Sequence, residues 1–413
     1  MTLLLVEMAV VILVTLTCGW LVRFVGQSRV VGEIIGGILL GPSVFGRLAP
    51  HTADLLFPKS SFASLDILST AGLVLFLFLT GMEQDSKQLF RERKTVAVVS
   101  SMSVLAPLTL GALLAIPMRP LFAPPGISAT PFTLFMAISM SITALPVLAR
   151  ILEERRMQKT PLGVTAILCA AVEDVVGWLL LGVALAFIGT GNGPSSLSMR
   201  LTGLVVFVAT MLGVVRPLAA RLAHGHHDQE LSLELLGLVI VFVLVCAAAT
   251  DAMGIHPLFG AFLAGVCFPR VEKWQTAMRQ RMGMLLSLLL LPLFFALTGM
   301  RTRLDLLSGG TTWMWAGIVL FAAVAGKLGG ASLGARLTGK SWRDSVALGA
   351  LMNTRGLVEL VVLNIAYNVG AFSQTLFTML VLMALITTMS TSPILNLLRI
   401  GGRYAAESAA AEP

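Results

Sequence analysis

The chain has 413 residues, of which 56% are hydrophobic and only 12% are charged, and its formal net charge is +8. A soluble domain normally has about twice this charged fraction, so the composition excludes a protein whose whole surface faces water. Apolar stretches of membrane-spanning length recur along the chain, which predicts a polytopic α-helical membrane protein embedded in the lipid bilayer. We therefore interpret the positive charge through membrane topology and expect no nucleic-acid binding.

Charged and Pro/Gly-rich breaks divide the chain into thirteen apolar segments, each a candidate transmembrane helix. They cover residues 3–22, 30–46, 62–82, 95–117, 131–149, 161–189, 201–223, 231–250, 255–269, 283–300, 311–335, 345–369 and 373–398. The first segment lacks a basic start and a small-residue cleavage site, so we expect a retained helix and not a signal peptide. Residues 1–400 are predicted to form one transmembrane domain, and residues 401–413 a short cytoplasmic tail.

Lysine and arginine are distributed unequally between the two sides of the predicted membrane. The loops after odd-numbered segments, with the tail, contain 21 of them, and the loops after even-numbered segments contain six. The remaining two, Lys327 and Arg355, lie inside segments. Because cytoplasmic loops are enriched in Lys and Arg, the N-terminus is predicted outside and the C-terminus in the cytoplasm, as for a protein of the bacterial inner membrane.

The cysteines and the histidine cluster give no strong sign of a metal or a cofactor. All four cysteines lie in apolar runs without a CxxC pair or a histidine at ligand spacing: Cys18, Cys169, Cys246 and Cys267. They are interpreted as small buried hydrophobic residues. The cluster "HGHHDQE" at 224–230 could bind metal or sense pH, but a solvated cytoplasmic loop is favoured. We expect no resident cofactor.

The sequence contains an internal repeat. "LFLFLTGMEQD" at 75–85 resembles "LFFALTGMRTR" at 293–303, and "GGILLG" at 36–41 has the glycine spacing of "GAFLAG" at 260–265. These matches pair segments 2 and 3 with 9 and 10, and by extension 5 with 12 and 6 with 13. Because partners are seven segments apart, they have opposite orientations in the membrane. The pattern predicts inverted repeats over about 30–189 and 255–398, as in secondary transporters.

Two paired segments contain helix-breaking residues at corresponding positions. Segment 5 contains "SITALPVLAR" at 141–150, in which Pro146 lacks a backbone N–H and Thr143 can bond to freed carbonyls. Segment 12 contains "LMNTRGLVEL" at 351–360, with three consecutive polar residues before a glycine: Asn353, Thr354 and Arg355. Either break alone could be a packing kink. Their correspondence favours crossed, discontinuous helices near the midplane, where such transporters bind substrates.

Four charged side chains lie well inside the segments. They are Glu173, Asp174, Lys327 and Arg355. A charge at this depth is costly unless it is paired or faces water. Glu359 follows Arg355 by four residues, and we expect these two to form an ion pair beside the broken helix. For Lys327, a structural ion pair and a functional role are both open.

Adjacent residues on a helix point about 100° apart, so Glu173 and Asp174 face different neighbours. If Glu173 pairs with Lys327, Asp174 is left without an obvious fixed cation. Such a carboxylate can carry a proton or a hard monovalent cation, but not both. This competition is the chemistry that an antiporter needs. We therefore expect Asp174 to be the shared cation and proton site, and Glu173 to be a second proton carrier or the counter-charge of Lys327.

Six motifs, in order, resemble those of the monovalent cation:proton antiporter family, on the branch of bacterial Kef-type proteins and plant and fungal cation/H⁺ exchangers. They are "VVGEIIGGILLGPSVFG" (30–46), "GLVLFLFLTGME" (72–83), "SITALPVLARILEE" (141–154), "IHPLFGAFLAGVCFP" (255–269), "PLFFALTGMRT" (292–302) and "LMNTRGLVELVVLNIA" (351–366). The resemblance implies a homodimer, with a dimerisation domain and a six-helix core domain containing crossed broken helices in each protomer. It also implies exchange of K⁺ or Na⁺ for protons by an elevator-like movement.

By this resemblance, Asp174 matches the ion-binding aspartate and Thr143 matches the unwound helix at the site. Lys327 matches the lysine that can pair with the residue before the aspartate. Glu173 departs from the family pattern, because this position is Asp in relatives linked with electrogenic exchange and Asn or Gln in those linked with electroneutral exchange. Exchange of two protons for one cation is slightly favoured, and the choice between Na⁺ and K⁺ is open.

Two other functions are weighed against exchange. A cation channel needs a selectivity filter or charged rings around a continuous pore, and no repeated filter sequence is present. A proton-coupled exporter of a small organic cation or metabolite would use the same fold. An enzyme is not expected, because the sequence contains neither HExxH nor GxSxG.

Overall fold

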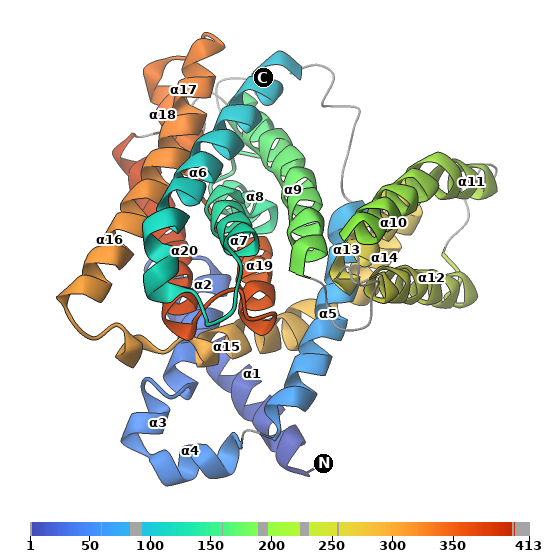
Figure 1. Cartoon of the computed structure of the whole chain (residues 1–413). Helices are drawn as coiled ribbons and strands as arrows, with labels where there is room; N and C mark the ends of the chain where they lie inside the picture. The colour runs from blue at the N-terminus through green and yellow to red at the C-terminus, as the bar shows by residue number, and fades with distance from the viewer. Residues whose placement is uncertain are drawn as a thin grey trace. The chain divides into compact units, whose positions relative to one another are not determined.

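The chain is an all-α polytopic membrane protein (Figure 1). The computed structural model describes residues 2–58, 60–82, 93–158, 160–188, 197–223, 231–253, 256–398 and 400, and these contain no β-strand. In these ranges ten helical runs are long and apolar enough to cross a membrane, and one helix pair bent by 42° is an eleventh. Two shorter apolar helices accompany them. Each of the thirteen predicted segments coincides with a helix or a helix pair, and the number of crossings stays a prediction.

The chain divides into two compact units. Unit 1 comprises Met1–Leu13, His51–Asp85 and Gly182–Leu297. Its helices are α4 (Pro50–Leu56), α5 (Phe62–Met82), α10 (Leu197–Thr210), α11 (Arg216–Ala223), α12 (Leu233–Ala252), α13 (Pro257–Cys267) and α14 (Glu272–Leu285). Two π-helical segments continue these helices: η2 (Met211–Val215) joins α10 to α11, and η3 (Leu286–Leu290) follows α14.

Unit 2 comprises Val14–Pro50, Ser86–Leu181 and Thr298–Pro413. Its helices are α2 (Arg29–Leu40), α3 (Phe45–Leu48), α6 (Arg93–Phe122), α7 (Ala129–Ser141), α8 (Leu145–Glu154), α16 (Gly310–Val324), α17 (Gly330–Leu337), α18 (Trp342–Met352), α19 (Leu357–Asn368) and α20 (Gln374–Leu397). A 3₁₀ turn, η4 (Leu304–Leu306), precedes α16, and a π-helical segment, η5 (Ala325–Gly329), joins α16 to α17. Three helices are divided between the two units: α1 (Thr2–Arg23), α9 (Pro161–Ile188) and α15 (Leu291–Arg301); α4 also contributes its first residue, Pro50, to unit 2.

The glycine motifs of the predicted repeat allow very close helix contacts. In unit 1, a Cβ atom on Gly81 of α5 would lie 2.2 Å from the carbonyl oxygen of Phe262 in α13. In unit 2, a Cβ atom on Gly299 of α15 would lie 2.3 Å from the carbonyl oxygen of Ile34 in α2. Small residues let membrane helices approach until their backbones touch. The two "LTGM" copies therefore have the same packing role, although the division into repeats stays a prediction.

One predicted boundary was wrong. The tenth segment was expected to begin at residue 283, but α14 begins at Glu272 and runs through η3 into α15. The added turns are amphipathic: Trp274, Met278 and Met282 are buried at i, i+4 and i+8, and the charged residues between them are exposed. A search for uninterrupted apolar runs excludes such a stretch. The 224–230 cluster and the 401–413 tail lie outside the described residues.

Candidate ion-binding site

Helices α7 and α8 are two halves of one interrupted segment in unit 2. Helix α7 ends at Ser141, α8 begins at Leu145, and the residues between them are not helical. Pro146 is in the first turn of α8, where its missing N–H leaves no helical hydrogen bond unmade. The interruption was expected at the proline, but the unwound stretch precedes it and the proline helps α8 to begin.

The second interruption lies between α18 and α19, and it bonds directly to the first. Asn353 closes the C-terminal end of α18, and the chain resumes as α19 at Leu357. The Ala144 N–H donates to the carbonyl oxygen of Thr354 at 3.0 Å, and the Thr143 hydroxyl lies 2.7 Å from the carbonyl oxygen of Met352. The expected crossing of two discontinuous helices is therefore present, and Figure 1 shows α7 and α19, which are in contact, beside one another.

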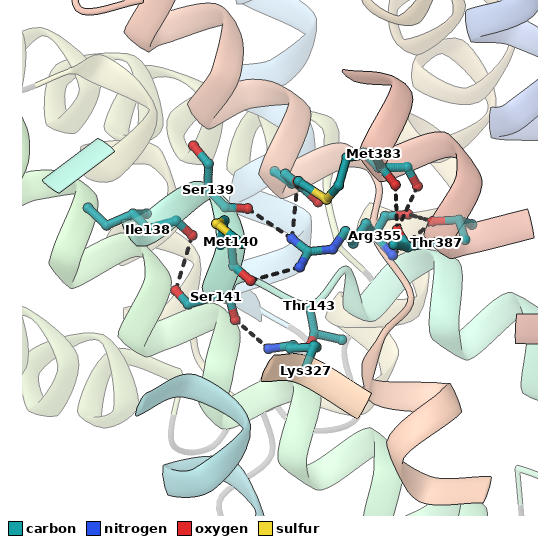
Figure 2. Close-up of polar contacts among 12 residues, drawn as sticks. Ile138, Ser139, Met140, Ser141, Thr143, Lys327, Arg355, Met383 and Thr387 are labelled. Atoms are coloured by element: carbon teal, nitrogen blue, oxygen red, sulfur yellow. Dashed lines mark hydrogen bonds and ion pairs between the residues drawn. The ribbon is translucent and has the colours of Figure 1, made fainter. Parts of the chain in front are cut away.

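Arg355 is bonded at this crossing through its two terminal nitrogens and its backbone, while its Nε is buried without a hydrogen-bond partner among the described residues. Its two terminal nitrogens donate to the carbonyl oxygens of Ser139 at 2.9 Å and Met140 at 2.7 Å (Figure 2). It also forms the expected ion pair with Glu359 at 3.1 Å, and both side chains are fully buried. The Thr388 hydroxyl of α20 bonds to the backbone of Arg355 on both sides, accepting from its N–H at 2.9 Å and donating to its carbonyl at 2.6 Å.

Lys327 binds the same end of α7. It lies on the π-helical segment η5, and its ammonium donates to the carbonyl oxygen of Ser141, as Figure 2 shows. The last carbonyls of an α-helix have no partner within the helix and carry a partial negative charge. Lys327 and Arg355 together satisfy three of these carbonyls. The carboxyl end of α7 thus binds two cationic side chains. One of them, Lys327, lies on a π-helical segment, and such segments are frequent at functional sites.

Glu173 neutralises Lys327 through one of its two oxygens. Its Oε2 lies 2.5 Å from the Lys327 ammonium and 2.6 Å from the Thr143 hydroxyl, and both charged side chains are fully buried. Its Oε1 is buried without a hydrogen-bond partner among the described residues. The Thr143 hydroxyl has one proton, so it can donate either to Glu173 or to the Met352 carbonyl at a given moment.

Asp174 is the second buried carboxylate of this region, and no cationic side chain is hydrogen-bonded to it among the described residues. Its side chain is fully buried, and neither oxygen has a hydrogen-bond partner among the described residues. The N–H of Leu145, which opens α8, is within electrostatic reach of the carboxylate. The amino end of a helix favours negative charge, so α8 favours an anion at Asp174 without neutralising it. A buried carboxylate in this setting must bind a proton or a cation.

The predicted site residues are all in unit 2, where Glu173 bonds to Lys327 and Thr143, and Arg355 bonds to Glu359. The side chains of Asp174 and Asn353 are buried without a hydrogen-bond partner among the described residues. Two kinds of contact were not predicted from the sequence. They are the α7 carbonyls that accept hydrogen bonds from Lys327 and Arg355, and the hydrogen bonds between Thr388 and the Arg355 backbone. The carbonyls carry no residue-type signal. Thr388 lies in segment 13, the predicted repeat partner of segment 6, and this pairing could have directed attention to it.

The remaining ligand-type residues are not clustered. Within the described ranges, no group of three or more His, Cys, Asp or Glu side chains is placed to hold a metal ion. The four cysteines are free and buried: Cys18, Cys169, Cys246 and Cys267. This agrees with their interpretation as small packing residues.

The chain belongs to the sodium/hydrogen exchanger family, because the family model described as "Sodium/hydrogen exchanger, transmembrane" matches residues 12–397. The proteins of this family and fold are transporters and not enzymes. The chain is similar to cation/H⁺ antiporter 17 of Arabidopsis thaliana, with 39% identity over 95% of this chain and 48% of the relative. It is 37% identical to the Na⁺/H⁺ antiporter NhaS4 of Synechocystis, over 95% of this chain and 97% of the relative.

A yeast relative and a solved structure extend the comparison. The K⁺/H⁺ antiporter 1 of Saccharomyces cerevisiae is 33% identical over 90% of this chain and 43% of its own length. The chain thus spans about half the length of its plant and yeast relatives. The sodium proton antiporter MjNhaP1 of Methanocaldococcus jannaschii matches with a TM-score of 0.68 and 14% identity, covering 95% of this chain and 96% of that one. This last likeness shows the fold alone.

Proposed function

We propose that this chain exchanges a monovalent cation for protons across a membrane, with both ions competing for the Asp174 carboxylate. The observation that carries the proposal is a difference between two adjacent acids. Glu173 is bonded to Lys327 and Thr143, whereas Asp174 is equally buried and has no partner among the described residues. One negative charge is therefore available at the crossing of the broken helices, where this kind of transporter binds substrate.

Competition at one carboxylate couples the two fluxes. With a proton on Asp174 the site is neutral, and with a cation on the ionised carboxylate it is neutral again. The empty ionised state leaves an uncompensated buried charge, which is costly in a membrane. Only the two loaded forms can then change their access from one side to the other at low cost, and a cation crosses only in exchange for protons.

The assembly and the orientation are part of the same proposal. Relatives named as cation/H⁺ antiporters support K⁺ or Na⁺ as the cation. We infer a homodimer, with access alternating by an elevator-like movement. The N-terminus is placed outside and the C-terminus in the cytoplasm on the 21-to-6 distribution of Lys and Arg. The membrane is inferred to be a bacterial inner membrane.

Stoichiometry depends on whether the Glu173–Lys327 pair opens during transport. Both contacts of Glu173 use the same oxygen, so a rotation that presents Oε1 to the cation would break both together. Lys327 would then stay on the Ser141 carbonyl and could release a proton, which gives two protons per cation. A pair that stays closed leaves Asp174 alone to carry the proton. We favour the two-proton reading.

The test is transport by purified protein in liposomes that contain a pH-sensitive dye, with Na⁺, K⁺ or Li⁺ added outside. Wild-type protein should alkalinise the lumen when the cation is added outside and acidify it when the cation is loaded inside. The substitution Asp174→Asn keeps the shape and should abolish exchange, while Asp54→Asn, at an exposed position in unit 1, should leave it unchanged. Normal exchange by Asp174→Asn would reject the proposed site, and single-channel currents in planar bilayers would favour a channel.

A further inference from the structure

Unit 1 contains a large apolar groove that ion exchange does not use. It has a volume of about 610 Å³ and lies among α11, α12 and the turn from α13 into α14, which Figure 1 shows in green and yellow. Its walls are almost entirely aliphatic and aromatic, and include Leu218, Leu222, Leu238, Phe242, Phe268 and Trp274. A groove of this size and lining fits a hydrocarbon chain and offers few polar contacts to a hydrated ion.

A second hollow borders the groove. It is polar and basic, and we call it the basic basin. Its volume is about 590 Å³, and the charged residues in its walls are Lys273, Arg281 and one acid, Glu272. Arg281 donates a hydrogen bond to the carbonyl oxygen of Leu231 at 3.0 Å, which fixes its position at the start of α12. The side chains of all three charged residues are exposed. The basin therefore has an excess of one positive charge open to the surface.

The two hollows meet along two stretches of backbone. Leu231 lines the basin and Ser232 lines the groove; in the same way, Lys273 lines the basin and Trp274 lines the groove. An apolar groove that leads to a basic basin has the chemical pattern of an acyl chain joined to a negatively charged headgroup.

We propose that this composite site binds an anionic phospholipid, with an acyl chain in the groove and the headgroup phosphate on Lys273 and Arg281. In the predicted orientation, both stretches lie at the cytoplasmic surface, where anionic lipids are concentrated. The attraction of a juxtamembrane Lys or Arg to such a surface favours a headgroup with a net negative charge over a zwitterionic one. The proposal is independent of the cation that is transported, because every residue in it lies in unit 1 and the candidate ion site lies in unit 2.

Two other occupants of the groove are outcomes of the test. A second copy of the chain could cover the groove with its own apolar side chains, but such a partner does not explain the basic basin. A free phosphate could bind the basin, but it would leave the groove unused. The phospholipid accounts for both hollows at once.

The experiment measures lipid binding to wild-type protein purified in detergent, by native mass spectrometry and by the midpoint of thermal unfolding. Palmitoyl-oleoyl phosphatidylglycerol is compared with the phosphatidylcholine of the same chains, and inorganic phosphate is a third arm. We expect phosphatidylglycerol to be retained about tenfold more strongly than phosphatidylcholine. It should also raise the unfolding midpoint more, and inorganic phosphate should have no effect on either measurement.

Two variants separate the headgroup from the chain. Lys273→Gln combined with Arg281→Gln should remove the preference between the two lipids and leave general lipid retention unchanged. Ala219→Trp, which fills the groove, should weaken the retention of both lipids. The matched control is Lys340→Gln with Arg343→Gln, which removes the same charges from unit 2; Arg343, like Arg281, donates to a backbone carbonyl, that of Leu398. The control should retain the wild-type preference.

Several results would overturn the proposal. These are equal retention of the two lipids by wild-type protein, an unchanged preference in the Lys273/Arg281 variant, or an equal effect of inorganic phosphate. A shift from dimer to monomer in Ala219→Trp without any change in lipid retention would assign the groove to a second copy. If the double variant does not purify, Thr276→Glu adds a negative charge to the basin at an exposed position, and it should abolish the preference in the same way.

Discussion

The two helix interruptions of unit 2 are built alike, but they differ in how their charges are matched. Between α18 and α19, Arg355 meets Glu359 four residues later and two carbonyls of α7, and Thr388 bonds to its backbone on both sides. Beside the α7/α8 interruption, Lys327 takes one oxygen of Glu173, and Asp174 has no hydrogen-bond partner among the described residues.

This difference shows that an interrupted helix is not by itself an ion site. Both interruptions free backbone groups, and both have buried charges nearby. In one of them the charges cancel between two residues four positions apart in the chain, so the region is a structural joint. In the other, Asp174 has no hydrogen-bonded cation among the described residues, and we propose that a mobile ion neutralises it. The following predictions test whether the α18/α19 interruption is a structural joint and the α7/α8 interruption is the ion site.

The largest effect is expected in the joint. Arg355→Gln removes the cation that neutralises Glu359 and bonds to Ser139 and Met140, so a buried carboxylate and two carbonyls lose their partner. Such a change typically costs about 3–5 kcal/mol. We expect little folded protein, measured by size-exclusion profile and thermal unfolding in detergent. The exposed control Arg343→Gln should unfold like wild type. A variant of Arg355 that is stable but inactive would instead make this arginine part of the ion site.

An effect of similar size, but reversible, is expected at the Glu173–Lys327 pair. Lys327→Gln leaves Glu173 as a buried charge without its cation and should cost about 3–5 kcal/mol. Adding Glu173→Gln removes that charge, so the double variant should recover most of the lost stability. Thermal unfolding of the wild type, both single variants and the double variant gives the coupling energy.

The same pair decides the stoichiometry. If it opens during transport, the double variant should lose the dependence of exchange on membrane potential, measured with valinomycin in K⁺ or a protonophore when Na⁺ is the substrate. Wild-type exchange that ignores the imposed potential would reject two protons per cation. In that case the pair is a fixed strut, and the double variant should retain transport.

A smaller effect separates the two interruptions by their threonines. Thr388→Val removes two hydrogen bonds to the Arg355 backbone and should lower stability by about 1–3 kcal/mol without changing the apparent KM for the cation. Thr387→Val is the control, because within the described part of the chain the Thr387 hydroxyl donates only to carbonyls of its own helix. Thr143→Val should lower stability and also change the KM, since Thr143 bonds to Glu173, and Thr143→Ser should restore both. Equal KM values for Thr143→Val and wild type would place Thr143 outside the ion site.

The fold and the charge pairs could be predicted from the sequence because they depend on residue type and spacing. Apolar runs of membrane length located the helices, and the four-residue spacing of Arg355 and Glu359 indicated their pairing. The 100° offset of adjacent helical residues indicated that only one of Glu173 and Asp174 could meet Lys327. The structure contains both ion pairs, while the role of Asp174 stays a prediction.

Other features depend on backbone geometry and could not be predicted in this way. The carbonyls that receive Lys327 and Arg355 become available only because α7 ends at Ser141, with three non-helical residues before α8 begins, and any residue type offers the same oxygen. The amphipathic start of α14 was missed because its charged face interrupts the apolar run. The basic basin beside α12 joins residues about forty positions apart, which no local pattern relates.

The central claim is that one cation displaces one proton from Asp174, and proton release on binding tests it most directly. Calorimetric titration of purified protein with Na⁺ or K⁺, repeated in buffers of different ionisation enthalpy, counts the protons released per cation bound. We predict release of at least one proton in wild-type protein, a cation affinity that falls as the pH falls, and neither binding nor release in Asp174→Asn. Cation binding without proton release in the wild type, or unchanged release in Asp174→Asn, would contradict the account.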